Sequence, residues 1–252
     1  MEAHARSLLL IIGVVAGPAV AADVGPANFG GSLALSSDYV YHGLSQTCGD
    51  PAAQADLHYR SSGGESPSEL FAGVWGSAGL GRSDCGHARE FDAYGGYSVA
   101  LGQESSATLT YSHYGNPGGT YYLEPVAGYR YDYDTLEAQW AWLDEIYVTL
   151  GWTPDAVRFV DYRPRRDRSA LSYGLQLHQP LAGGFSLSAG LGYDEIADPE
   201  GTGYGFWNAG MAYGWGPVQI EAVYIGTASR ATREFGSYVA GNRAALSAVW
   251  RF

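Results

Sequence analysis

Few side chains of this sequence could support acid–base or nucleophilic chemistry, and their spacing opposes it. Ser112 and His113 are adjacent, so in an extended strand they point to opposite faces and cannot pair as nucleophile and base. His42 and Ser45 differ in strand parity, and no third residue is placed to orient the histidine. The glycines fall in strands and turns rather than in a phosphate-binding loop that opens a helix. We therefore expect neither an enzyme nor a bound cofactor.

Cys48 and Cys85 are the only cysteines in the chain. Each falls in a long connection between predicted strands, and in an exported protein both would meet an oxidising compartment. We therefore expect a disulfide between Cys48 and Cys85, provided that the loop geometry lets the bridge close. The alternative is a metal site made of Asp84, Cys85 and His87, although their spacing is not one that zinc sites use.

Five arginines are concentrated in one predicted connection, 153–168. They are Arg158, Arg163, Arg165, Arg166 and Arg168. A guanidinium group matches a phosphate in a bidentate fork, so this segment could contact the phosphates of lipopolysaccharide. It could instead fold inward as one wall of a constriction, or remain a solvated surface loop. The chain has no lysine and a formal net charge of −12, which opposes a nucleic-acid partner.

Composition and the N-terminus indicate an exported β-protein. The chain of 252 residues has 36 glycines and 20 tyrosines, but only 16% of its residues are charged. Many aromatic residues and few charges exclude intrinsic disorder, and frequent glycine opposes a helical protein. Arg6, an apolar run over 8–15 and small residues up to Ala22 predict a signal peptide over residues 1–22. Cleavage is expected between Ala22 and Asp23, which leaves residues 23–252 as the mature domain.

The mature chain repeats segments of about ten residues in which apolar and polar side chains alternate, as in transmembrane β-strands. Residues 184–194 place Phe185, Leu187 and Leu191 on one face, with serine, glycine and aspartate on the other. The predicted strands are 29–43, 52–61, 68–78, 89–101, 104–114, 133–142, 145–152, 169–179, 184–194, 205–215, 217–227 and 242–252.

The connections between these segments alternate between long and short along the chain. Short turns at one membrane face and longer loops at the other are typical of an up-and-down barrel. With twelve strands, both ends of the mature chain lie on the short-turn side. We therefore predict an all-β fold, an up-and-down antiparallel transmembrane β-barrel. A soluble exported β-sandwich or β-barrel is the alternative.

The last predicted strand ends in aromatic residues. Trp250 and Phe252 share one face with Leu246 and Ala248. A terminal strand with a final aromatic residue resembles the C-terminal signal by which outer-membrane barrels reach the barrel-assembly machinery. We therefore expect Trp250 and Phe252 to direct assembly into the outer membrane of a Gram-negative bacterium.

The predicted inward faces carry ionisable groups. The charged ones are Asp38, Asp56, Arg60, Asp92, Glu137, Asp194, Glu221, Arg243 and Arg251. His42, His58 and His178 share these faces. Charge inside a barrel indicates water inside, because an unpaired buried charge is costly. A twelve-stranded lumen lies between a filled eight-stranded core and an open sixteen-stranded channel. Both a narrow pore and a plugged lumen therefore stay open, and a pore would prefer cations because carboxylates outnumber arginines.

The segment 35–46 reads Leu-Ser-Ser-Asp-Tyr-Val-Tyr-His-Gly-Leu-Ser-Gln. It resembles the opening of the TorF porin family, also labelled Gcw_chp, on Ser37, Asp38, Tyr39, Gly43, Ser45 and Gln46. The chain departs from that pattern at His42, where the family usually has arginine. The resemblance implies an outer-membrane β-barrel and says little about the solute. We expect a monomer that lets small hydrophilic solutes diffuse through and that contacts lipid and lipopolysaccharide. The alternative is a non-conducting barrel that binds, adheres or stabilises the envelope.

Overall fold

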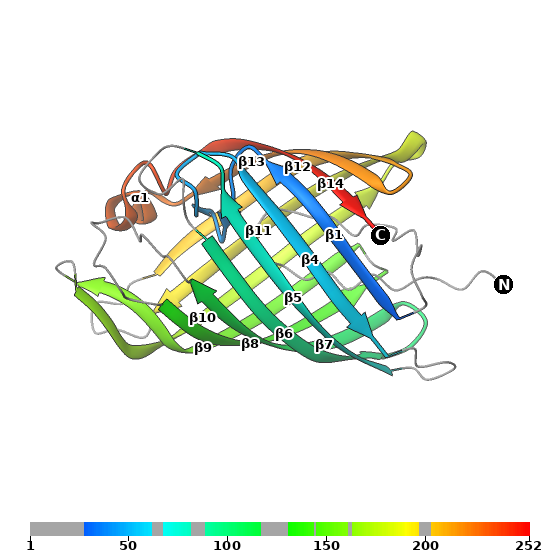
Figure 1. The fold of residues 1–252 in the computed structure, drawn as a ribbon, viewed down its shortest axis with the longest axis horizontal. Coiled ribbons are helices and arrows are strands. Elements are labelled where there is room, and N and C mark those ends of the chain that lie inside the picture. Colours follow the sequence, from blue (N-terminus) through cyan, green and yellow to red (C-terminus); the bar gives the residue numbers. More distant parts are fainter. Residues whose placement is uncertain are drawn as a thin grey trace.

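The computed structural model describes residues 28–61, 68–81, 89–116, 131–143, 145–160, 163–196 and 203–252. Within them the chain forms a closed antiparallel barrel of twelve strands (Figure 1). The barrel strands are β1 Phe29–Ser36, β4 Ala52–Arg60, β5 Ser68–Gly79, β6 Arg89–Ala100, β7 Ser105–Asn116, β8 Tyr131–Trp142, β9 Ile146–Val160, β10 Arg163–Pro180, β11 Phe185–Ile196, β12 Gly203–Trp215, β13 Val218–Thr227 and β14 Arg243–Arg251. This confirms the fold predicted from the alternation.

The barrel closes where its first and last strands meet. Each strand pairs with its neighbour in sequence, and β1 pairs with both β4 and β14. Gly31 and Phe252 exchange both backbone hydrogen bonds, at 2.9 and 3.0 Å, so the final residue belongs to the seam. The rings of Trp250 and Phe252 pack together with their centroids 5.1 Å apart. Closure gives each barrel strand a hydrogen-bonded neighbour on both sides within the wall, as a bilayer requires.

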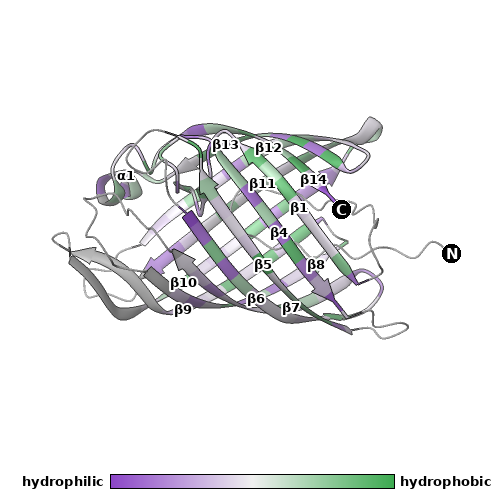
Figure 2. Ribbon diagram, viewed as in Figure 1, coloured by the Kyte–Doolittle hydropathy of each residue, from purple (hydrophilic) through white to green (hydrophobic). Residues whose placement is uncertain are grey.

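The outer surface of the barrel is apolar and the inner face is mixed, so hydropathy alternates along the strands (Figure 2). Leu70 and Leu191 are 61% and 60% exposed, whereas Ser77 and Ser188 on the opposite faces are buried. Exposed leucine, phenylalanine, tyrosine and tryptophan surround the barrel. Such a continuous apolar surface is not compatible with a soluble protein and fits a lipid environment.

No helix of the described residues is both long and apolar enough to cross a membrane. The helical segments are α1 Ser229–Phe235 and the single turn Ala182–Gly184.

The two ends of the barrel differ. One end carries the turns 101–104, 181–184 and 216–217 and the connection between β8 and β9, together with the start of β1 and the end of β14; we call it the short-turn end. The other, the long-loop end, carries α1 and the connection between β1 and β4 (Figure 1). The predicted loop 153–168 is wrong, because β9 and β10 continue past the barrel mouth as a paired hairpin. Arg165 pairs with Arg158 there, and the register shifts on either side of Arg168.

The first strand also ends earlier than predicted. The sequence predicts one strand over 29–43, but β1 stops at Ser36 and the chain leaves the barrel wall. Two short strands follow, β2 Val40–Tyr41 and β3 Leu44–Ser45, and they pair only with each other. This hairpin lies within the mouth of the long-loop end (Figure 1).

Candidate functional site: a hairpin across the barrel lumen

Residues 37–50 turn into the lumen, and we call this segment the inward hairpin. Its turn is His42-Gly43, with φ of +46° and +78°, so two left-handed residues join β2 to β3. Two positive φ values in a two-residue loop match the twist of a tight hairpin. A Cβ at Gly43 would lie 2.6 Å from the Thr227 methyl and 2.7 Å from the Phe206 Cβ. Glycine is therefore required both by the turn and by its contact with the wall.

Asp38 anchors the base of the inward hairpin to β14. Arg243 donates from Nη1 to the Asp38 carboxylate at 2.8 Å. The Ser45 hydroxyl donates to the same carboxylate, and so does the Thr47 hydroxyl at 3.1 Å. Arg243 also donates from Nη2 to the Val239 carbonyl at 2.7 Å. The buried carboxylate therefore holds both sides of the hairpin and the 236–242 connection on a single charge-assisted network.

His42 fixes the tip of the inward hairpin on β11 and β12. Its ring stacks between Tyr41 and Phe206, with centroids 4.0 and 5.1 Å away. Its Nδ1 lies 3.0 Å from the Asp194 carboxylate on β11. Burial by itself lowers the pKa of His42, but the Asp194 carboxylate and its hydrogen bond outweigh that effect, so the pKa is raised. The charged form of His42 therefore favours this position of the tip.

The flanks of the inward hairpin contact further strands. The Tyr39 ring packs on Trp75 of β5 with centroids 5.4 Å apart, and its hydroxyl hydrogen-bonds to Glu90 of β6. Burial raises the pKa of Tyr39 well above its ordinary value. On the other flank Val40 packs in a buried cluster with Val223, Ile225 and Ala245. The segment therefore contacts both sides of the lumen and narrows its mouth.

All six residues of the family motif lie in the inward hairpin rather than in a barrel strand. Besides Asp38, Tyr39, Gly43 and Ser45, the motif includes Ser37, whose amide donates to the Leu246 carbonyl at 2.8 Å. The Gln46 amide donates to the Tyr39 carbonyl at 2.6 Å, closing the base. The sequence held one signal for this: two short apolar–polar runs separated by two residues, which is hairpin spacing.

The structure places the predicted lumen charges of the barrel strands on inward faces, and each of the three arginines has an acidic neighbour. Arg60 lies 3.2 Å from Glu69, and Arg251 interacts electrostatically with Glu221. The Asp56 carboxylate accepts from the Tyr94 hydroxyl at 2.6 Å and lies 2.6 Å from His58 Nδ1. Sequence reasoning missed Glu69 and Glu90, which share strand parity with inward neighbours near the predicted ends of their strands.

Several predicted residues lie outside the described residues. These are Ala22 and Asp23 at the expected cleavage site, Cys85, and the metal alternative Asp84 with His87. Cys48 takes part in a disulfide. The backbone of Arg158, Arg163, Arg165, Arg166 and Arg168 belongs to β9 and β10, while their side chains are outside the description.

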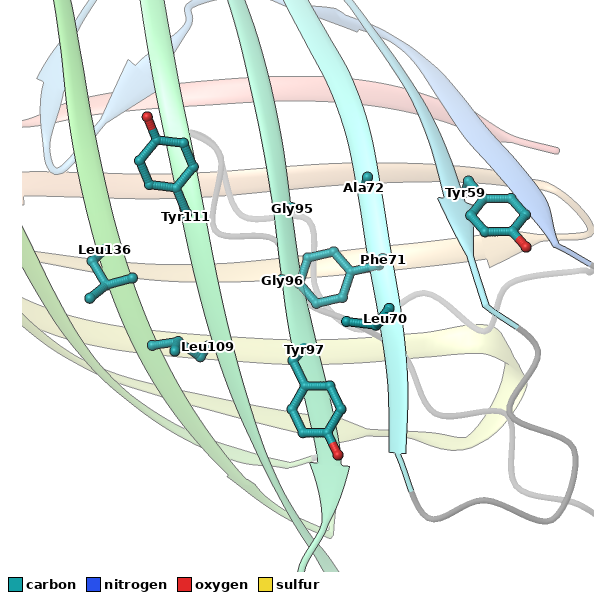
Figure 3. Close-up of a pocket in the computed structure, with 10 residues that line it drawn as sticks. All are labelled: Tyr59, Leu70, Phe71, Ala72, Gly95, Gly96, Tyr97, Leu109, Tyr111 and Leu136. Carbon is teal, nitrogen blue, oxygen red and sulfur yellow. The ribbon is translucent and has the colours of Figure 1, made fainter.

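A separate hollow of about 480 Å³ opens on the outer surface of β4 to β8 rather than in the lumen (Figure 3). Gly95 and Gly96 form its floor, and Leu70, Leu109 and Leu136 line its sides. Because these leucines are exposed on the apolar outer surface, the hollow faces lipid. It is therefore no part of a solute path.

The lumen, the closed ladder and the apolar exterior define a membrane-spanning β-barrel, and solved structures of outer-membrane channels share this fold. An outer-membrane channel of Pseudomonas putida F1 labelled COG4313 is 12% identical with a TM-score of 0.54, covering 89% of this chain and 95% of that one. The KdgM porin is 10% identical with a TM-score of 0.51, covering 88% and 99%. No curated protein sequence matches the chain.

The chain belongs to the Gcw_chp family, described as bacterial proteins of unknown function, whose model matches residues 20–250. This confirms the family resemblance seen in the sequence.

Proposed function

We propose that the protein is an outer-membrane channel through which small hydrophilic solutes diffuse, and that the inward hairpin forms its constriction. The observation that carries this proposal is the hairpin itself. A segment joined to the wall by Asp38–Arg243 and His42–Asp194 narrows a lumen lined with ionisable groups. A barrel that only needed filling could use apolar side chains, which carry no desolvation cost.

One observation favours a second candidate, a barrel that does not conduct. Inward polar side chains are buried even away from the inward hairpin, among them Thr110, Gln139, Ser188 and Ser247. Close packing of these groups would leave little room for solute. In that case the protein would bind or stabilise the envelope, and the hairpin would be a permanent plug.

Single-channel recording in a planar bilayer decides between the two candidates. The wild type is expected to give small conductance steps. Replacing residues 40–45 by Gly-Gly joins Tyr39 to Gln46, which already pair through their backbones, and should enlarge the steps. A heat-denatured sample is the control. Steps absent from both folded proteins would overturn the channel and support the plugged barrel.

The environment follows from the same fold. We propose insertion in the outer membrane as a monomer, after signal-peptide cleavage and through the barrel-assembly machinery that would read Trp250 and Phe252. The apolar exterior would contact lipid, and the extended β9–β10 hairpin carries its arginines beyond the mouth, where lipopolysaccharide phosphates would lie. A disulfide between Cys48 and Cys85 would tie the end of the inward hairpin to the neighbouring connection.

A further inference from the structure

The charges of the lumen are unevenly paired. Arg243 forms an ion pair with Asp38 and Arg60 with Glu69, while Arg251 interacts electrostatically with Glu221. Three inward carboxylates on β6 and β8 have no arginine partner among the described side chains: Glu90, Asp92 and Glu137. β6, β7 and β8 are consecutive neighbours in the barrel wall (Figure 1). We call these three carboxylates, with Tyr114 between them, the acidic pocket.

Tyr114 of β7 is the centre of the acidic pocket. It interacts electrostatically with Glu137, Asp92 and Glu90, so all three carboxylates lie within range of one side chain. Glu90 and Asp92 are two residues apart on one strand and share its inward face. The histidine of the hairpin tip is the basic group that acts on Glu137.

Asp92 lacks the partners that a buried carboxylate needs. It is 1% exposed, and neither of its carboxylate oxygens has a hydrogen-bond partner. The Gly115 backbone stabilises its charge without reaching hydrogen-bond geometry. Glu90 is its charged neighbour and repels it. Burying an unpaired carboxylate costs several kcal/mol, and a positive ligand beside it would offset that cost.

The surroundings of the pocket suit an organic cation better than a metal ion. Tyr114 stacks on Tyr133 with centroids 4.5 Å apart, and Tyr41 lies 6.2 Å from Tyr114. Aromatic faces attract ammonium groups. No three His, Cys, Asp or Glu side chains in the described part of the chain are close enough to hold a metal ion together.

We propose that the acidic pocket binds a small organic ammonium ion, and that Tyr39 of the inward hairpin is its lid. The assignment rests on the proposed function only in that the cation would enter through the channel. Tyr39 is itself buried, packs on Trp75, and reaches Glu90 with its hydroxyl. Because Trp75 pairs with Asp92 across the ladder, the lid lies over both carboxylates of β6. Binding therefore competes with the closed position of Tyr39.

Titration calorimetry with ethylammonium chloride on the folded full-length barrel in detergent tests the assignment. Sodium chloride at equal ionic strength is the reference. We expect saturable binding in the wild type and tighter binding in Tyr39→Ala. Asp92→Asn and Glu90→Gln should each weaken binding about tenfold, since each removes one charge contact. Glu221→Gln is the matched control, because Glu221 is an equally buried inward carboxylate on β13 that lies outside the acidic pocket and interacts electrostatically with Arg251.

Each outcome separates this inference from the channel. Ethylammonium binding without any conductance would contradict the proposed channel function and support the acidic pocket. Conductance without ethylammonium binding in either the wild type or Tyr39→Ala would overturn the pocket and leave the channel standing. Equal competition by sodium, or an equal loss in Glu221→Gln, would also overturn the assignment. Heat-modifiable gel mobility shows which variants are folded, and two carboxylate variants are provided in case one is not.

Discussion

The two sides of the lumen differ in whether their buried charges have an oppositely charged neighbour. On β13 and β14 each inward charge has an opposite charge near it, since Arg243 forms an ion pair with Asp38 and Arg251 interacts electrostatically with Glu221. On β6 and β8 three carboxylates gather around tyrosines without an arginine among the described side chains. A wall on which opposite charges lie near each other, which we call the paired wall, holds structure in place because the charges offset one another. An unpaired wall has a charge left over, which is the condition for binding a mobile cation.

The inward hairpin joins these two walls. Asp38 at its base belongs to the paired wall, whereas Tyr39 reaches Glu90 on the acidic wall. The connection that contains α1 behaves differently, since it stays at the mouth of the long-loop end and contacts the hairpin there (Figure 1). Val239 of that connection accepts from the Ser45 amide at 2.9 Å. The paired wall is therefore expected to control whether the hairpin stays in place.

The largest effect is expected from Arg243→Met. It leaves the Asp38 carboxylate buried without its cation, a change worth about 3 kcal/mol for a buried pair. The opening equilibrium of the inward hairpin should rise about a hundredfold, and the conductance steps should grow. Hydrogen exchange at the amides of Ser45 and Gln46 measures this directly, because both are bonded within the closed arrangement.

The control for that experiment is Arg60→Met at the short-turn end. Its ion pair with Glu69 is also inward but lies near the end of β4, away from the inward hairpin. Exchange at Ser45 and Gln46 should stay at the wild-type rate there. Equal acceleration in both variants would show that the barrel as a whole, rather than the anchor, had loosened.

The sequence predicted the barrel and missed the inward hairpin for one physical reason. Alternation with period two reports which face of a strand is apolar, so it identifies strands wherever one face meets lipid. It continues through Tyr39 and Tyr41 even though the chain has left the ladder at Ser36. Those tyrosines face other aromatic rings inside the lumen, which periodicity cannot distinguish from lipid. The ion-pair partners could not be predicted from the sequence either, because Asp38 and Arg243 come together only when the barrel closes.

A smaller effect is expected on ion selectivity. We predict a cation preference, because carboxylates remain after the inward arginines are paired, and rings of carboxylates concentrate cations. Arg251→Met makes the paired wall resemble the acidic one and should raise the cation-to-anion permeability ratio roughly twofold. Reversal potentials under a salt gradient measure the ratio, and the difference should shrink at high salt through screening.

The extended β9–β10 hairpin, which carries the arginines, allows a further test of ion selectivity. Deleting residues 163–168 removes the backbone that carries four of its arginines. Anion preference that turns into cation preference after the deletion would mean that these arginines control the pore. Anion preference that persists would contradict the assignment of uncompensated carboxylates to the lumen.

The smallest expected effect is a dependence of conductance on pH through His42. The groups facing its ring are Asp194 on β11, Glu137 on β8, and Tyr41 and Phe206 on either side. Because the closed hairpin raises the pKa of His42, protonation stabilises closure. That contribution is complete below the ordinary histidine pKa and is lost as pH rises through the raised value. Conductance should therefore be larger at about pH 8 than at about pH 6.

His42→Gln keeps a hydrogen-bonding side chain but cannot be charged, and its conductance should not change over this interval. A wild-type conductance that falls with rising pH, or a variant that keeps the wild-type profile, would show that the tip of the hairpin is not the titrating element.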